Sequence, residues 1–169
     1  MHLLQGLSLT SNTIPSYLLI ASWLGLMRVM RRSSYGIAFF SLGATFIHEL
    51  CHLVYGFLLC AKPASFSLWP RRDGKHWVLG SVGFTNLNIW NSAFVAFAPL
   101  TMLWLGWVAF EYWMLPSFLG GYYLNWLVAG YAVTSCLIGC IPSPADVKIG
   151  ALSALMYGGI GYGLWQALH

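Results

Sequence analysis

The sequence predicts an all-α polytopic membrane protein with about five transmembrane helices and a short β-hairpin at the membrane surface. Of its 169 residues, 59% are hydrophobic and only 7% are charged. A soluble domain carries about 25% charged residues, so this chain has too few charges to cover a surface that faces water. Nine tryptophans and nine tyrosines fit the aromatic belts of the two membrane interfaces. We therefore expect one integral membrane domain over residues 1–169, in a multi-pass protein of the cell (inner) membrane.

The charge of the chain indicates which partners to expect. The formal net charge is +4, which suits contact with the anionic headgroups of a lipid bilayer. The sequence contains no basic stripe with interleaved aromatic residues, so we do not expect a nucleic acid as partner. The four cysteines include no Cys-x-x-Cys pair and are expected to be small buried hydrophobic residues. The oligomeric state stays open.

Two apolar segments predict the first two helices. Residues 13–30 predict a membrane helix that, at about 1.5 Å per residue, just spans a hydrocarbon core of ~30 Å. Residues 35–60 predict the second helix. It is expected to begin after the N-cap residues Ser33-Ser34 and to end before Pro63, which cannot continue the hydrogen-bond ladder.

Residues 64–88 differ from the rest of the chain because they contain two β-favouring runs, 66–69 and 77–82. Asp73-Gly74 lies between the runs and is a strong signal for a hairpin turn. We expect a β-hairpin at the membrane surface, with an ordinary surface loop as the alternative. An exposed strand edge there could pair with an unwound peptide by strand addition. The candidate substrate-binding residues on this edge are Ser81 and Val82.

Residues 89–110 predict the third helix, which contains Pro99. A proline at membrane depth leaves a backbone carbonyl without its helical partner, so a neighbouring group or water must satisfy that carbonyl. After a short loop at residues 111–116, residues 117–141 predict the fourth helix. Asn125 in this helix is expected to be buried by membrane depth. An interhelical hydrogen bond is its expected role, and contact with a substrate backbone is the alternative.

Residues 142–148 interrupt the helices with two prolines. Membrane depth tolerates irregular backbone only in a protein interior or beside water. Asp146 in this stretch is one of four acidic residues in the chain. Its carboxylate either complements the dipole of the last predicted helix, residues 149–168, or belongs to a functional site.

Basic residues predict the orientation of these spans. With five spans, the two termini face opposite sides of the membrane. If the N-terminus is cytoplasmic, five basic residues lie on the cytoplasmic side and three on the far side, which the positive-inside rule favours. The five are Lys62, Arg71, Arg72, Lys75 and Lys148, and the three are Arg28, Arg31 and Arg32.

A His-Glu-x-x-His motif at residues 48–52 lies inside the second predicted helix. A helical turn takes about 3.6 residues, so His48 and His52 lie on one face, about 6 Å apart along the axis. Two imidazoles in this arrangement can share a Zn²⁺ ion, and Glu49 beside them can accept a proton from water there. The alternative is that the three side chains only pair with one another within the helix bundle. Ionisable groups at membrane depth are costly, which favours the functional interpretation.

A catalytic zinc ion usually has three protein ligands and one open position, so the histidine pair needs a third partner. The candidates are Asp146, Glu111, Asp73, His2, His76 and His169. Asp146 is favoured because it alone lies in a kinked stretch that suits a protein interior. Iron(II) or cobalt(II) would also accept two histidines and a carboxylate.

These motifs resemble the site-2 protease class of intramembrane zinc metalloproteases. The order along the chain is the same: the His-Glu-x-x-His helix, a β-element, a helix with a proline motif and a proline-bearing stretch that ends in an aspartate. The resemblance covers residues 35–150, so residues 13–30 and 149–168 would be helices added around this core. The chain departs from the family where Val147 replaces a glycine after the aspartate and where Ala98 precedes Pro99.

The resemblance implies cleavage of a membrane protein or peptide by a zinc endopeptidase. It implies that His48, His52 and Asp146 hold Zn²⁺, that Glu49 is the general base and that Pro99 contacts the substrate. A catalytically silent membrane protein that keeps a metal or polar cluster for partner binding is the alternative. A metal carrier or channel ranks last, because the sequence offers few ligands along a pore.

Overall fold

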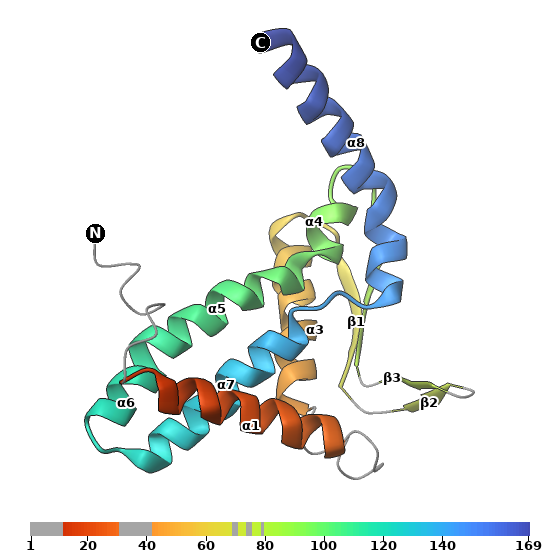
Figure 1. Ribbon diagram of the computed structural model, residues 1–169. Coiled ribbons are helices and arrows are strands. Elements are labelled where there is room, and N and C mark those ends of the chain that lie inside the picture. Colours follow the sequence, from red (N-terminus) through yellow and green to blue (C-terminus); the bar gives the residue numbers. More distant parts are fainter. Residues whose placement is uncertain (1–11, 31–41, 69–70, 74–75, 79) are drawn as a thin grey trace. The chain divides into compact units, whose positions relative to one another are not determined.

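The computed structural model describes residues 12–30, 42–68, 71–73, 76–78 and 80–169 (Figure 1). The described chain is mostly helical and has two small antiparallel sheets, so the helical part of the predicted fold class is confirmed. Several expectations concern residues outside this part of the chain. They are the place of Arg31 and Arg32 in the predicted orientation, the caps Ser33 and Ser34, the start of the second predicted helix and the candidate ligand His2.

The described residues belong to two compact units. Unit 1 comprises Met1–Ile47 and Thr101–Cys140, and unit 2 comprises His48–Leu100 and Ile141–His169. Helix α3 (Leu42–Leu58) contributes its first turns to unit 1 and the remainder to unit 2. All three members of the predicted metal site belong to unit 2. The single integral membrane domain stays a prediction.

Unit 1 is helical. Its elements are α1 (Ile14–Met30), the start of α3, α5 (Thr101–Ala109), the π-helical turn η3 (Phe110–Met114), α6 (Leu115–Leu119) and α7 (Tyr123–Gly139). The helices α1 and α5 both pack against α7. The centre of the packing is a buried apolar cluster of Phe110, Met114, Ala129 and Val133. The first predicted helix, residues 13–30, is confirmed as a helix, because α1 begins one residue later and ends at the same residue.

The predicted loop and fourth helix of unit 1 are wrong in their boundaries. The helical path continues past Glu111 through η3 into α6, where Pro116 occupies the first turn. A proline is tolerated in a first turn because its missing N–H would have no helical partner there. The chain instead breaks after α6, at Gly121, whose φ of +74° lies in the left-handed region that glycine adopts without strain. The helix predicted from residue 117 therefore begins only at Tyr123.

Unit 2 combines the rest of α3 with strands and two further helices. Its other elements are β1 (Pro63–Ser67), β2 (Arg71–Asp73), β3 (His76–Val78), β4 (Ser81–Phe84), α4 (Ser92–Ala96), the 3-10 turn η2 (Ala98–Leu100) and α8 (Pro144–Leu168). Helix α4 packs against α8 (Figure 1).

The predicted hairpin is confirmed, but its strands are divided. Strand β2 pairs with β3, and β1 pairs with β4, both antiparallel. The predicted turn at Asp73-Gly74 lies partly outside the described residues, because these do not include residues 74–75. The run predicted as one strand over residues 77–82 is split at Gly80, between β3 and β4. A glycine weakens a strand because it has no side chain to pack and loses the most backbone freedom.

The predicted third helix, residues 89–110, is also interrupted. It is divided into α4, η2 and α5, and the interruption contains Pro99. A proline has no N–H and its ring clashes with the preceding turn, so a regular helix cannot pass through this position without distortion. The predicted irregular stretch at residues 142–148 is shorter than expected, because α8 already begins at Pro144.

The length and composition of the described helices bear on whether they can span a membrane. No single described helix is both long enough and apolar enough to cross a bilayer. One bent pair, α7 with α8, passes that test when the two are taken together, and α1 and α3 are shorter apolar helices. The number of membrane spans therefore stays a prediction.

Candidate metal centre

Helix α3 places its two histidines one turn apart on the same face. The Nε2 atoms of His48 and His52 lie 3.2 Å from each other, and the rings are nearly perpendicular, at 76°. Both side chains are largely buried, with 13% and 6% of their surface exposed. The motif therefore directs two imidazole nitrogens toward one point inside unit 2.

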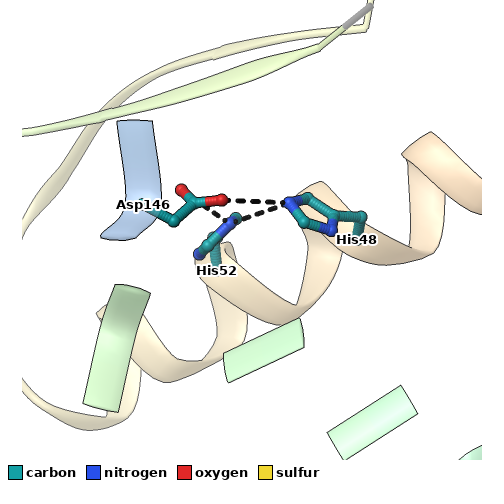
Figure 2. A group of neighbouring side chains, drawn as sticks. All are labelled: His48, His52 and Asp146. Carbon is teal, nitrogen blue, oxygen red and sulfur yellow. Dashed lines mark hydrogen bonds and ion pairs between the residues drawn. The ribbon is translucent and has the colours of Figure 1, made fainter. Parts of the chain in front are cut away.

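Asp146 approaches the same point from the first turn of α8 (Figure 2). Its Oδ2 lies 3.4 Å from Nε2 of His48, and its Oδ1 lies 3.3 Å from Nε2 of His52. The predicted convergence of the three side chains is confirmed by these distances. Glu111 belongs to unit 1, and Asp73 and His76 lie in β2 and β3.

A capping box holds the Asp146 carboxylate in place. The backbone N–H of Ser143 donates to Oδ2 of Asp146 at 2.7 Å, and the backbone N–H of Asp146 donates to Oγ of Ser143 at 3.2 Å. Pro144 at the first helical position favours the start of α8 at this point. The two interpretations of Asp146 are thus compatible, because its carboxylate caps the helix and also faces both imidazoles.

The distances between these side chains suit a small cation. One nitrogen or oxygen from each of the three residues can be chosen so that all lie within 4.8 Å of one another, and the group could hold a metal ion. A tetrahedral zinc ion lies about 2.0–2.1 Å from each nitrogen or oxygen ligand, which separates two ligands by about 3.3 Å. The closest approaches in this group are 3.2, 3.3 and 3.4 Å, and each of the two Asp146 distances involves a different carboxylate oxygen. The donor set and its spacing therefore fit Zn²⁺, although the identity of a metal stays a prediction.

A backbone carbonyl determines how His52 faces the group. Nδ1 of His52 lies 2.8 Å from the carbonyl oxygen of Val95 in α4. Because a carbonyl only accepts hydrogen bonds, Nδ1 carries the proton and donates it. In the neutral ring, Nε2 then has a free lone pair that points toward His48 and Asp146. A lone pair beside a carboxylate needs a proton or a metal ion between them.

Glu49 follows His48 on α3 and is buried, with 9% of its surface exposed. It lies between the two histidines in the same turn of α3. Glu49 therefore belongs to the same electrostatic environment as the three candidate ligands, which is where a proton acceptor for this group is needed.

The predicted substrate-binding residues lie in different surroundings. Ser81 and Val82 are partly buried in β4, where they pair with Ser67 and Phe66 of β1. Pro99 is fully buried in η2, so its ring is not accessible to a substrate in this structure. Asn125 is exposed on α7 in unit 1, so packing against the other described helices does not bury it, and its burial by membrane depth stays a prediction. It lies in the first turn of that helix, where neighbouring residues are exposed as well.

Sequence reasoning missed a serine that joins α8 to α4. Oγ of Ser153 donates to the carbonyl of Ile89 at 2.6 Å and accepts from the backbone N–H of Ala93 at 3.2 Å. Ser153 follows Asp146 by seven residues, so both lie on one face of α8. The sequence does contain a signal for this link. Ser153 lies on the same face of an apolar helix as Asp146, and a polar side chain there is expected to need a partner.

A close contact between the helices reinforces this link. A Cβ atom added at Gly150 would lie 2.7 Å from Cβ of Ala96 and 3.0 Å from the ring of Phe97. Gly150 lies one turn after Asp146 on the same face of α8. The absence of a side chain at Gly150 therefore lets α8 approach α4 closely enough to place the carboxylate beside His52.

Two asparagines, also missed, connect the end of α3 to the segment before α4. Nδ2 of Asn86 donates to the carbonyl of Cys60 at 2.8 Å, and Nδ2 of Asn91 donates to the carbonyl of Leu59 at 3.4 Å. These carbonyls lie just past the C-terminal end of α3. The asparagines thereby help to hold α3 in register with α4, whose Val95 carbonyl His52 needs.

The role of Gly150 leads to a prediction. Gly150→Ala should lower the free energy of unfolding by about 1–3 kcal/mol, because the new methyl group overlaps Ala96. It should also weaken Zn²⁺ binding, because α8 must move together with Asp146. Denaturant unfolding and zinc titration of the purified chain measure both effects.

Gly158→Ala is the matched control for this variant. Gly158 lies on the same helix, and a Cβ atom there would meet nothing within 4 Å. Alanine should raise helix stability by up to about 1 kcal/mol at this position and leave zinc binding unchanged. Equal zinc binding in the two variants would show that the contact at Gly150 does not position Asp146.

Comparison with known proteins identifies no relative of this chain. No family model, curated protein or solved structure matches the chain. The assignment of a function therefore depends on the geometry of the group itself.

Proposed function

We propose that this chain is an intramembrane zinc endopeptidase of the site-2 protease type, which cleaves a transmembrane or membrane-associated peptide. The observation that carries the proposal is the convergence of His48, His52 and Asp146, at separations of 3.2 to 3.4 Å, beside a buried Glu49. A structural metal site would have no need of a carboxylate beside its ligands. The presence of Glu49 therefore favours an enzyme over a silent metal-binding protein.

The side chains of the group would divide the work of peptide hydrolysis. A bound Zn²⁺ would supply Lewis-acid polarisation of the scissile carbonyl and would lower the pKa of water at the site toward ~7. Glu49 would take a proton from the attacking water and pass it to the leaving amine. Val95 would keep His52 oriented through its carbonyl, and Ser143 would keep Asp146 oriented through its backbone N–H.

The strands of unit 2 support a way of presenting the substrate. A peptide bond inside a helix is hydrogen-bonded, so a transmembrane substrate must unwind before it can be attacked. Strands β1 and β4 form a sheet with no third strand among the described residues, so each has one edge free of a strand partner. We propose that an extended substrate pairs with the edge of β4 at Ser81 and Val82.

The surface of the described helices supports a membrane environment. Large apolar side chains along α8 are strongly exposed, among them Leu152, Leu155 and Leu168 at 69%, 73% and 81%. A surface of this kind is unfavourable in water and is expected where lipid or another protein covers it. Together with the low content of charged residues, it supports the proposal that the protein lies in a lipid bilayer.

Cleavage of defined peptides tests the proposal. The purified chain, reconstituted in liposomes, would be incubated with single-span peptides that carry Gly, Asn or Pro near the middle of the apolar segment. We expect a cut within that segment that stops when a chelator is added and resumes when Zn²⁺ is restored. Mass spectrometry of the products locates the cut. Stoichiometric zinc binding with every peptide left intact would instead support the silent metal-binding protein.

A further inference from the structure

The Val95 carbonyl is available to His52 because of the residue that follows it by four positions. In a regular α-helix, the carbonyl of residue 95 would accept a hydrogen bond from the N–H of residue 99. Residue 99 is a proline, which has no N–H. Nδ1 of His52 lies 2.8 Å from this carbonyl instead. The sequence predicts that Pro99 leaves a carbonyl for a neighbouring group to satisfy. That carbonyl is the one of Val95, and the neighbouring group is Nδ1 of His52.

The surroundings of Pro99 favour His52 over water as the donor to the Val95 carbonyl. Pro99 is fully buried, and Val95 and His52 are 2% and 5% exposed, so water has little access to the carbonyl. The backbone tightens at the same place, where the N–H of Leu100 donates to the carbonyl of Phe97 in a 3-10 turn. The N–H of Phe97 is shared between the carbonyls of Ala93 and Val95, and its well-formed hydrogen bond, at 2.9 Å, is the one to Ala93. A buried carbonyl without a good donor would cost about 1–3 kcal/mol. This cost favours the ring orientation in which His52 supplies the donor.

We infer that Pro99 is a positioning residue for the metal centre, which acts by keeping the Val95 carbonyl open to His52 and so sets which ring nitrogen of His52 faces the metal. Free neutral histidine favours the form with the proton on Nε2, which could not bind a metal through that atom. The hydrogen bond to Val95 selects the opposite form, with the proton on Nδ1 and the lone pair on Nε2. The inference rests on the proposed function only for its effect on catalysis.

A substitution that restores the backbone N–H tests this role. In Pro99→Ala, the new backbone N–H at position 99 can compete with His52 for the Val95 carbonyl. We expect the His52 ring to change from one form, protonated on Nδ1, to a mixture of both forms. Loss of an outer-shell partner of this kind typically costs 10- to 100-fold in metal affinity, so we expect a fall in zinc affinity of about that size.

The experiment uses the full chain in detergent, labelled with ¹⁵N-histidine, without metal and at a pH where the imidazoles are neutral. Couplings between ring protons and ring nitrogens identify the protonated nitrogen, and the signals absent from His52→Gln assign the ring. Pro116→Ala is the matched control, because it also removes a helix proline but lies in the first turn of α6. It should leave both the His52 signals and zinc affinity unchanged.

The outcomes separate this inference from the proposed function. A wild-type His52 protonated on Nε2, or a Pro99→Ala variant with unchanged His52 signals, would overturn the role of Pro99 even if the chain cleaves peptides. The wild-type measurement can overturn the inference even if Pro99→Ala does not fold. A change of the His52 ring in Pro99→Ala would support the role even if no cleavage is detected, because the readout needs neither metal nor substrate.

Discussion

Glu49→Gln should reduce peptide cleavage by about 10²- to 10⁴-fold and leave zinc binding intact. This range is the usual contribution of a general base, and an amide of the same shape cannot accept the proton. The three candidate ligands stay in place because Glu49 is not one of them: the contacts between His48, His52 and Asp146, at 3.2 to 3.4 Å, do not involve its side chain. Cleavage assays and zinc content of the same preparation measure the two effects side by side.

Glu111→Gln is the matched control for this variant. Glu111 is the other glutamate of the chain and lies in η3 of unit 1, with a buried carboxyl oxygen that has no hydrogen-bond partner among the described residues. The same chemical change should leave cleavage unaltered at this position. Cleavage that survives Glu49→Gln would overturn the assignment of the general base and, with zinc still bound, would favour the silent metal-binding protein.

The pair of histidines could be predicted from the sequence because its geometry is local. Four residues along a helix determine the separation of His48 and His52, whatever the rest of the chain does. The position of Asp146 cannot be predicted from local geometry, because it depends on how α8 packs against α4. The sequence favours Asp146 through its kinked stretch and through the resemblance to the site-2 protease family, and the structure supplies the physical reasons in Ser143, Gly150 and Ser153.

The parts that could not be predicted depend on backbone groups and on local breaks. The carbonyl of Val95 is invisible in a hydrophobicity pattern, although Pro99 indicates that some carbonyl must find another donor. Helix boundaries were wrong where one residue has two possible roles. Pro116 suits a loop as well as the first turn of α6, and Gly121 suits close helix packing as well as the left-handed turn that ends a helix.

The two roles of Asp146 lead to the second large expected effect. Asp146→Asn keeps a side-chain oxygen that can accept from the Ser143 N–H but removes the negative charge that a metal ion binds. We expect zinc affinity to fall by more than about 100-fold, beyond the loss typical of an outer-shell partner, while stability changes little. His48→Ala should show a loss of similar size. Zinc titration and denaturant unfolding of each variant supply the measurements.

Ser143→Ala separates helix capping from metal binding in the opposite direction. It removes the hydroxyl that accepts from the Asp146 N–H but leaves the carboxylate and its bond from the Ser143 backbone. Loss of this cap should lower the free energy of unfolding by about 1 kcal/mol and change zinc affinity only slightly. If Asp146→Asn instead retains zinc and behaves as Ser143→Ala does, Asp146 is a capping residue alone. The third ligand would then have to be another residue, since the histidine pair by itself does not complete a catalytic zinc site.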